Sequence, residues 1–134
     1  MDAPLVTDEV VVDLRQVAAG HARGGVGEAL NQRLAAFVAK SGLDAIFLMD
    51  TGGRTIAASN AGTPGSFLDQ NYSFRPYFQS ALRGEQGQFY GIGSTTGLPG
   101  YFFADAVTGP EGIVHGVIAI KLDLTQLEQA WREA

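Results

Sequence analysis

The hydrophobic pattern of the chain changes its period at Asp44, and this change constrains the fold more than any other feature. Before Asp44, residues 28–40 carry apolar side chains at helical spacing, among them Leu30, Leu34 and Phe37. After Asp44 the apolar side chains form short runs typical of strands, at 45–49, 55–59, 88–92, 100–107 and 113–121. This order predicts an α+β fold with an antiparallel sheet of about five strands and helices packed around it.

Glycine-rich segments divide the strand region. Asp50-Thr51-Gly52-Gly53 and Thr108-Gly109-Pro110-Glu111-Gly112 each predict a hairpin, because glycine supplies the positive φ that tight turns need. Between the second and third strands, Pro76 suits the first turn of a short helix that runs to Arg83 and ends at Gly84, with Ser73 as its N-cap.

The two ends of the chain predict further helices. Residues 5–23 have the amphipathic spacing of Val10, Leu14 and Val17, and Asp123 caps a helix over 124–133. We therefore expect one domain over 1–134, with a helical part at 1–44, a sheet core at 45–123 and a C-terminal helix at 124–134. The N-terminal helices carry more apolar surface than a small sheet needs, which predicts a weak, parallel homodimer.

Composition excludes several classes of function. Nine Lys and Arg residues against 14 Asp and Glu give a net charge of −5, so nucleic acid is a poor partner. The chain has no cysteine, which excludes thiolate chemistry, and its two histidines, His21 and His115, are too far apart to suggest a metal site. No nucleophile–base pair or phosphate-binding loop is recognisable, so we expect neither an enzyme nor a cofactor.

The residues Asn71-Tyr72-Ser73-Phe74-Arg75-Pro76-Tyr77-Phe78 place one arginine among aromatic side chains. An arginine in such surroundings is costly unless an anion pairs with its planar fork of donors. A polar segment, Gly93-Ser94-Thr95-Thr96-Gly97, precedes the aromatic Tyr101-Phe102-Phe103, and Lys121 ends an apolar strand. Together these features predict a receptor site for a small anion.

The chain resembles the extracytoplasmic sensor domain of bacterial four-carbon dicarboxylate sensor histidine kinases, which have PAS-like folds of the Cache group. The resemblance covers roughly residues 28–131. It is carried by the segments 56–60, 71–78, 90–97, 100–104 and 116–124, which read IAASN, NYSFRPYF, YGIGSTTG, GYFFA and GVIAIKLDL.

The resemblance implies a periplasmic sensing module of a membrane-anchored histidine kinase, with no chemistry of its own and with succinate, fumarate or malate as its ligand. The positions that match the ligand-binding residues of the family are Tyr72, Arg75, Ser94, Thr95, Thr96, Tyr101 and Lys121. We expect Arg75 and Lys121 to hold the two carboxylates at opposite ends of one pocket, with no metal or cofactor.

Two alternatives remain open. Related Cache modules bind amino acids and use aspartates to hold the ammonium group, whereas here Ala104 occupies such a position and Asp105 should point to the opposite face. A lysine at 121 would repel an amine, so a second carboxylate fits better, and another small carboxylate or an amino acid stays the alternative ligand. The other alternative is a dimerisation scaffold whose pocket is filled by its own side chains.

Overall fold

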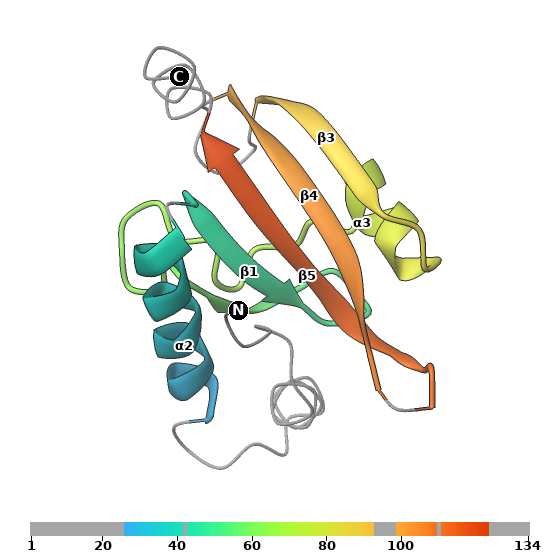
Figure 1. The fold of residues 1–134 in the computed structure, drawn as a ribbon, viewed down its shortest axis with the longest axis horizontal. Helices are drawn as coiled ribbons and strands as arrows, with labels where there is room; N and C mark the ends of the chain where they lie inside the picture. Colours follow the sequence, from blue (N-terminus) through green and yellow to red (C-terminus); the bar gives the residue numbers. More distant parts are fainter. Residues whose placement is uncertain (1–25, 42, 93–98, 110, 124–134) are drawn as a thin grey trace.

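The computed structural model describes residues 26–41, 43–92, 99–109 and 111–123, and it shows an α+β fold (Figure 1). In chain order the elements are α2 (Val26–Ser41), β1 (Ala45–Met49), β2 (Thr55–Ala58), α3 (Pro76–Leu82), β3 (Gly87–Ile92), β4 (Pro99–Thr108) and β5 (Val114–Asp123). The five strands form one antiparallel sheet in the order β2-β1-β5-β4-β3, which confirms the predicted fold class.

The sheet has two different faces because side chains alternate along each strand. One face, called here the aromatic face, carries Phe47 of β1 and Phe102 of β4, together with Phe67, Tyr72 and Tyr77 from the segments that cover it. The alternation along β5 places Val117 and Ala119 on this face. The opposite face, called here the α2 face, carries Ile46, Leu48, Ile56 and Ala57 from β1 and β2, and Val107 from β4.

The two helices pack against opposite faces and near opposite ends of the sheet, α2 against β1 and β2 and α3 against β3 and β4 (Figure 1). Leu30 and Leu34 of α2 are buried against the α2 face, as the helical spacing predicts. Tyr77, Phe78 and Ala81 of α3 are buried against the aromatic face. The connection between β2 and α3 adds Phe67 and Tyr72 to that core.

The turn chemistry predicted from the sequence is confirmed at Asp50–Gly53. The Asp50 carboxylate accepts hydrogen bonds from the backbone N–H groups of Gly52 and Arg54, at 2.9 and 3.0 Å, and Gly53 has a φ of 88°. Gly84 ends α3 with a φ of 84°, also as predicted.

The predicted cap of α3 is wrong. Arg75, not Ser73, is the N-cap residue, and its side chain makes no capping hydrogen bond. Pro76 occupies the first helical position and disfavours a helical backbone at the residue before it, so Arg75 is extended, with φ −76° and ψ 132°. Ser73 instead donates its backbone N–H to the Asn71 side chain at 2.9 Å.

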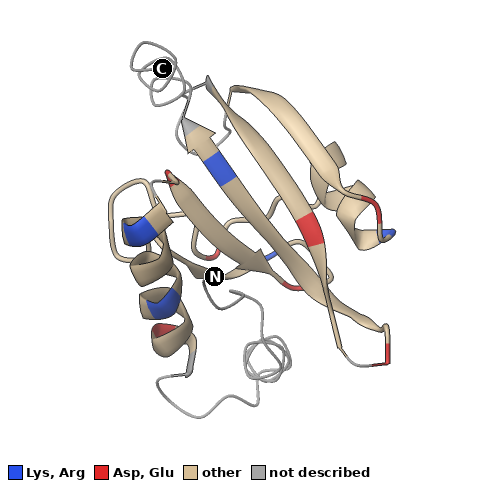
Figure 2. Cartoon of the chain, in the orientation of Figure 1, with Lys and Arg blue, Asp and Glu red and all other residues tan. Residues whose placement is uncertain are grey.

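Several predictions fall outside the described ranges. These are the helix over 5–23, the helix over 124–133 and the homodimer that the N-terminal helices would form. Neither α2 nor α3 is long and apolar enough to cross a membrane. Basic and acidic positions are interspersed along the described part of the chain (Figure 2).

Candidate ligand-binding site

A row of paired residues crosses the aromatic face from β3 to β1. Phe89 pairs with Phe102, Phe102 pairs with Lys121, and Lys121 pairs with Ala45. Paired residues of neighbouring strands project to the same face of a sheet. The register therefore places Lys121 on the aromatic face, two strands away from Phe89, and confirms the prediction that it shares a face with Val117 and Ala119.

Arg75 lies at the β3 end of this row. Its guanidinium is 4.6 Å from the centre of the Phe89 ring and 4.9 Å from that of the Phe74 ring. One of its nitrogens, Nη2, donates a hydrogen bond to the carbonyl oxygen of Ile92 at 3.2 Å. Two aromatic contacts and one hydrogen bond to a backbone carbonyl thus fix the plane of the Arg75 guanidinium group at the end of β3.

Lys121 lies on β5, two strands away from Phe89 in this row, and is almost fully buried, with 2% of its surface exposed. Its ammonium is 3.2 Å from the Oδ2 atom of Asp44 and 6.0 Å from the centre of the Phe67 ring. A Cβ atom at Gly100 would lie 3.4 Å from Cε of Lys121, which is van der Waals contact, so the lysine stem passes close to β4 at this glycine. A buried ammonium of this kind requires a counter-ion, and Asp44 supplies one.

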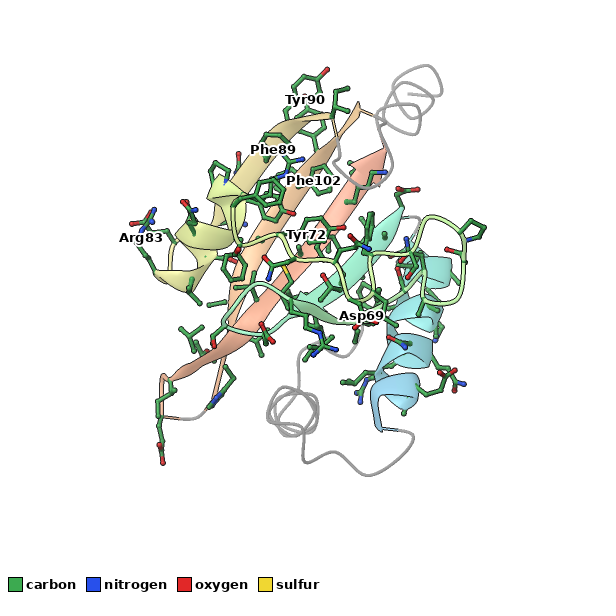
Figure 3. All side chains as sticks on the ribbon, turned by 180° about the vertical axis from the view of Figure 1, so that it is seen from behind. Asp69, Tyr72, Arg83, Phe89, Tyr90 and Phe102 are labelled. Carbon is green, nitrogen blue, oxygen red and sulfur yellow. The ribbon has the colours of Figure 1, made fainter. Side chains whose placement is uncertain are left out.

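Aromatic rings line this face on both sides of Lys121: Phe102 lies between the two cations, and Phe47 lies on β1, beyond Lys121. The Tyr72 ring is 5.4 Å from Phe47 and 6.1 Å from Phe67, and the Tyr77 ring stacks on Phe102 at 5.6 Å. Figure 3 shows Tyr72, Phe89 and Phe102 on the same side of the sheet. Apolar walls around few charged groups strengthen the electrostatic attraction of any anion that enters.

Tyr77 adds a neutral hydroxyl to this face. Burial raises the pKa of Tyr77 above the usual value for tyrosine, and the neighbouring Tyr72 raises it further, while Arg75 acts in the opposite direction. Tyr77 therefore remains protonated at neutral pH. The sequence did not assign Tyr77 to the site, because a buried tyrosine in a short helix is more often a core residue.

Tyr101 does not lie with the other predicted site residues. It pairs with Tyr90 and Leu122, and its ring packs 4.8 Å from Tyr90 and 6.3 Å from Phe103 on the α2 face side of the sheet. Phe102 occupies the position on the aromatic face instead. Asp105 is exposed and faces away from the buried Ala104, as the alternation predicted.

Ser94, Thr95 and Thr96 lie outside the described residues. The residues on either side of that segment, Ile92 and Pro99, are paired in the sheet, and Ile92 is the residue whose carbonyl accepts the bond from Arg75.

Asp44 is a charged residue next to Lys121 that was not predicted from the sequence to belong to the site. It lies between α2 and β1, where it has no strand or helix pattern, and it meets Lys121 across 77 positions of the chain. Its pairing with Lys121 changes the expected charge balance, since one of the two cations already has an anionic partner. Within the described ranges, no group of three His, Cys, Asp or Glu side chains is arranged as metal ligands.

Comparison with known proteins identifies relatives of this fold and sequence. No protein-family model matches the chain. The C4-dicarboxylate transport sensor protein DctB of Pseudomonas aeruginosa is 39% identical over 101 residues, which are 75% of this chain and 16% of that protein. The chain therefore spans about one sixth of that relative.

Solved structures agree with this relationship. The sensor domain of the V. cholerae histidine kinase DctB superposes with a TM-score of 0.84 and 31% identity, over 96% of this chain and 48% of that one. The sensor domain of E. coli DcuS has the same fold, with a TM-score of 0.69 and 17% identity over 98% of this chain and 85% of that one. The chain belongs to the family of PAS-like, Cache-type sensor domains found in the DctB sensor histidine kinases.

Proposed function

We propose that this domain binds a four-carbon dicarboxylate, such as succinate, fumarate or malate, on the aromatic face between Arg75 and Lys121. The observation that carries the proposal is the row Phe89–Phe102–Lys121, which puts the two cations at opposite ends of one aromatic surface. The names of the P. aeruginosa and V. cholerae relatives, a C4-dicarboxylate transport sensor and a DctB kinase, support this choice of ligand.

The geometry suits a short diacid. Neighbouring strands lie about 4.8 Å apart, so the backbones at Phe89 and Lys121 are separated by roughly 10 Å. In the proposed complex, the side chains of Arg75 and Lys121 approach the ligand from the two ends of this interval, and a four-carbon diacid lies between them. A rigid sheet then makes chain length a criterion of selection.

Each residue has a distinct part in the proposed complex. The fork of Arg75 receives one carboxylate in the two-pronged arrangement that guanidinium groups favour, with the hydroxyls of Tyr72 and Tyr77 as additional donors. Lys121 receives the second carboxylate, since an ammonium carries three N–H donors and can bind more than one acceptor. The hydroxyls of Ser94, Thr95 and Thr96 are included as further donors to the ligand only because of the family resemblance. Tyr101 takes no part in the proposed complex.

The relatives also support a proposal for the biological setting. We place the domain on the periplasmic side of the membrane, as the ligand-sensing part of a membrane-anchored histidine kinase whose catalytic domain lies elsewhere. The domain itself performs no reaction, and signal output passes through the parent protein. Association of two copies through the N-terminal helices belongs to the same proposal.

A second candidate is an amino acid ligand, and Asp44 is the observation that favours it. A carboxylate at the Lys121 end of the row can pair with an ammonium group, while Arg75 binds the carboxylate of the same molecule. Lys121 opposes this arrangement, because its own charge repels the incoming ammonium over the same few ångströms. The dicarboxylate therefore remains the better fit.

A thermal-shift series separates these possibilities. The chain is heated with saturating succinate, malate, glutarate, butyrate or L-aspartate. A ligand at 100 times its Kd adds about 2.7 kcal/mol of stability, which corresponds to several degrees for a domain of this size. We expect succinate and malate to give the largest shifts. The largest shift with aspartate would favour the amino acid site, and no shift with any acid would favour a scaffold.

A further inference from the structure

Asp44 contacts Lys121 at two points. Its backbone N–H donates to the carbonyl oxygen of Lys121 at 3.1 Å, and its carboxylate lies 3.2 Å from the lysine ammonium. The lysine side chain is 2% exposed and that of Asp44 is 33% exposed. By contrast, the ion pairs Arg54–Asp69 and Arg83–Glu85 join side chains that are more than half exposed.

This contact places a protein carboxylate at the end of the row where the second carboxylate of a ligand is expected. In the absence of ligand, Asp44 supplies a negative charge beside the buried ammonium. When a dianion binds, one ammonium faces two carboxylates, and like charges within a few ångströms repel each other strongly where water is scarce. The two carboxylates therefore compete for Lys121.

We infer that Asp44 is an internal competitor for the second carboxylate of the ligand, and that it sets how strongly the site favours dianions over monoanions. This inference rests on the proposed function, because it concerns the same site. Asp44 lowers the affinity for diacids but has little effect on monoacids held by Arg75 alone. It thereby shifts the concentration range over which the domain responds to diacids.

The opposite interpretation is that Asp44 only positions Lys121 for the ligand. The two interpretations predict opposite signs for Asp44→Asn. Asparagine has almost the same shape, and its amide oxygen still accepts a hydrogen bond from the ammonium, but the charge is gone. If Asp44 competes, the variant binds diacids more tightly; if Asp44 only positions Lys121, the variant binds them equally or less well.

The test is calorimetric titration of the wild-type chain and Asp44→Asn with succinate and with butyrate, an acid with the same carbon chain and one carboxylate fewer. Asp105→Asn serves as the matched control, since Asp105 is exposed on the other face of the sheet. We expect succinate to bind Asp44→Asn roughly 10- to 100-fold more tightly than wild type, from removal of a repulsion at about 5 Å. Butyrate should change less than about threefold, and Asp105→Asn should match wild type for both acids.

Unchanged or weaker succinate binding in Asp44→Asn overturns the inference while the proposed function stands. If no variant and no wild-type chain binds either acid, the proposed function fails and the inference fails with it. Should Asp44→Asn not fold, carbon NMR of the wild-type chain decides. The Asp44 carboxyl signal should move when succinate saturates the protein and stay in place with butyrate, and no movement with bound succinate overturns the inference.

Discussion

The guanidinium of Arg75 donates a hydrogen bond to the carbonyl oxygen of Ile92 at 3.2 Å and so joins the start of α3 to the end of β3. The same group lies against the Phe89 ring, the first member of the row that leads across the sheet to Lys121. The orientation of the arginine is thus fixed by the fold before any ligand arrives, which reduces the entropy lost on binding.

Replacing Arg75 by lysine should weaken succinate binding at least 30-fold. The ammonium of lysine has no fork, and loss of one buried charged hydrogen-bond pair costs about 2–5 kcal/mol. Arg83→Lys, at an arginine whose side chain is 61% exposed, should bind like wild type. Calorimetric titration of both variants with succinate provides the measurement, and an unchanged Kd for Arg75→Lys would remove Arg75 from the site.

Gly53→Ala should destabilise the protein more than Gly62→Ala. Both glycines have positive φ, 88° and 82°, but a Cβ atom at Gly53 would lie 2.6 Å from Cβ of Ser73, whereas none of the described atoms lies within 4 Å of one at Gly62. The φ strain costs about 1–2 kcal/mol at each position, and the overlap adds about 1–3 kcal/mol at Gly53 alone. Urea unfolding of the two variants measures the difference in the free energy of unfolding. Equal losses of stability would contradict the close contact between Gly53 and Ser73.

The same turn also positions Tyr72, whose backbone N–H donates to the carbonyl oxygen of Gly53 at 2.9 Å. Gly53→Ala should therefore weaken succinate binding as well, while Gly62→Ala should leave it unchanged.

Thr55→Val should stabilise the protein by about 1 kcal/mol. Thr55 is completely buried, and its hydroxyl has no hydrogen-bond partner among the described residues, so valine removes a desolvation cost at nearly constant shape. Thr63→Val is the control with the opposite sign, because the Thr63 hydroxyl donates to the carbonyl oxygen of Asn60 at 2.7 Å. Chemical unfolding of the two variants checks the prediction, and a loss of stability in Thr55→Val would show that the hydroxyl is satisfied.

The raised pKa of Tyr77 predicts that the protein loses stability at alkaline pH. Its pKa in the folded protein is raised by burial above the value of about 10 for an exposed tyrosine. The contribution to stability is complete below pH ~10 and falls above it by up to about 1.4 kcal/mol per pH unit, because the unfolded chain ionises first. The free energy of unfolding at pH 8 and pH 11 should fall less in Tyr77→Phe than in wild type.

Tyr90→Phe is the matched control for this experiment, since the Tyr90 side chain is largely exposed and should leave the pH dependence as it is in the wild type. The same dependence on pH in Tyr77→Phe and Tyr90→Phe would mean that Tyr77 is not the group responsible.

Local sequence signals predicted most of the fold. The spacing of Leu30 and Leu34 gave the buried side of α2, and the residues Asp50–Gly53 gave the first hairpin, because helix periodicity and turn chemistry are both local properties. The Ser73 cap failed because the effect of Pro76 on the residue before it outweighed the capping preference of serine.

The candidate site was less predictable, for two different reasons. Tyr101 and Ala104 are three positions apart, so a regular strand cannot place both on one face; the burial of Ala104 on the aromatic face excludes Tyr101 from it. This conflict was visible in the sequence. The contact between Asp44 and Lys121 was not, because it depends on the pairing of β1 with β5 across most of the chain.

The central claim is that Lys121 receives the second carboxylate of a diacid. The most direct measurement is the ratio of the butyrate Kd to the succinate Kd, by calorimetric titration, in the wild-type chain, in Lys121→Ala and in Lys40→Ala, where the lysine is exposed at the end of α2. We expect a ratio of roughly 30 or more in wild type and Lys40→Ala, and a ratio of about one or less in Lys121→Ala, where Asp44 still repels the second carboxylate. Butyrate binding as tightly as succinate in the wild-type chain would contradict it.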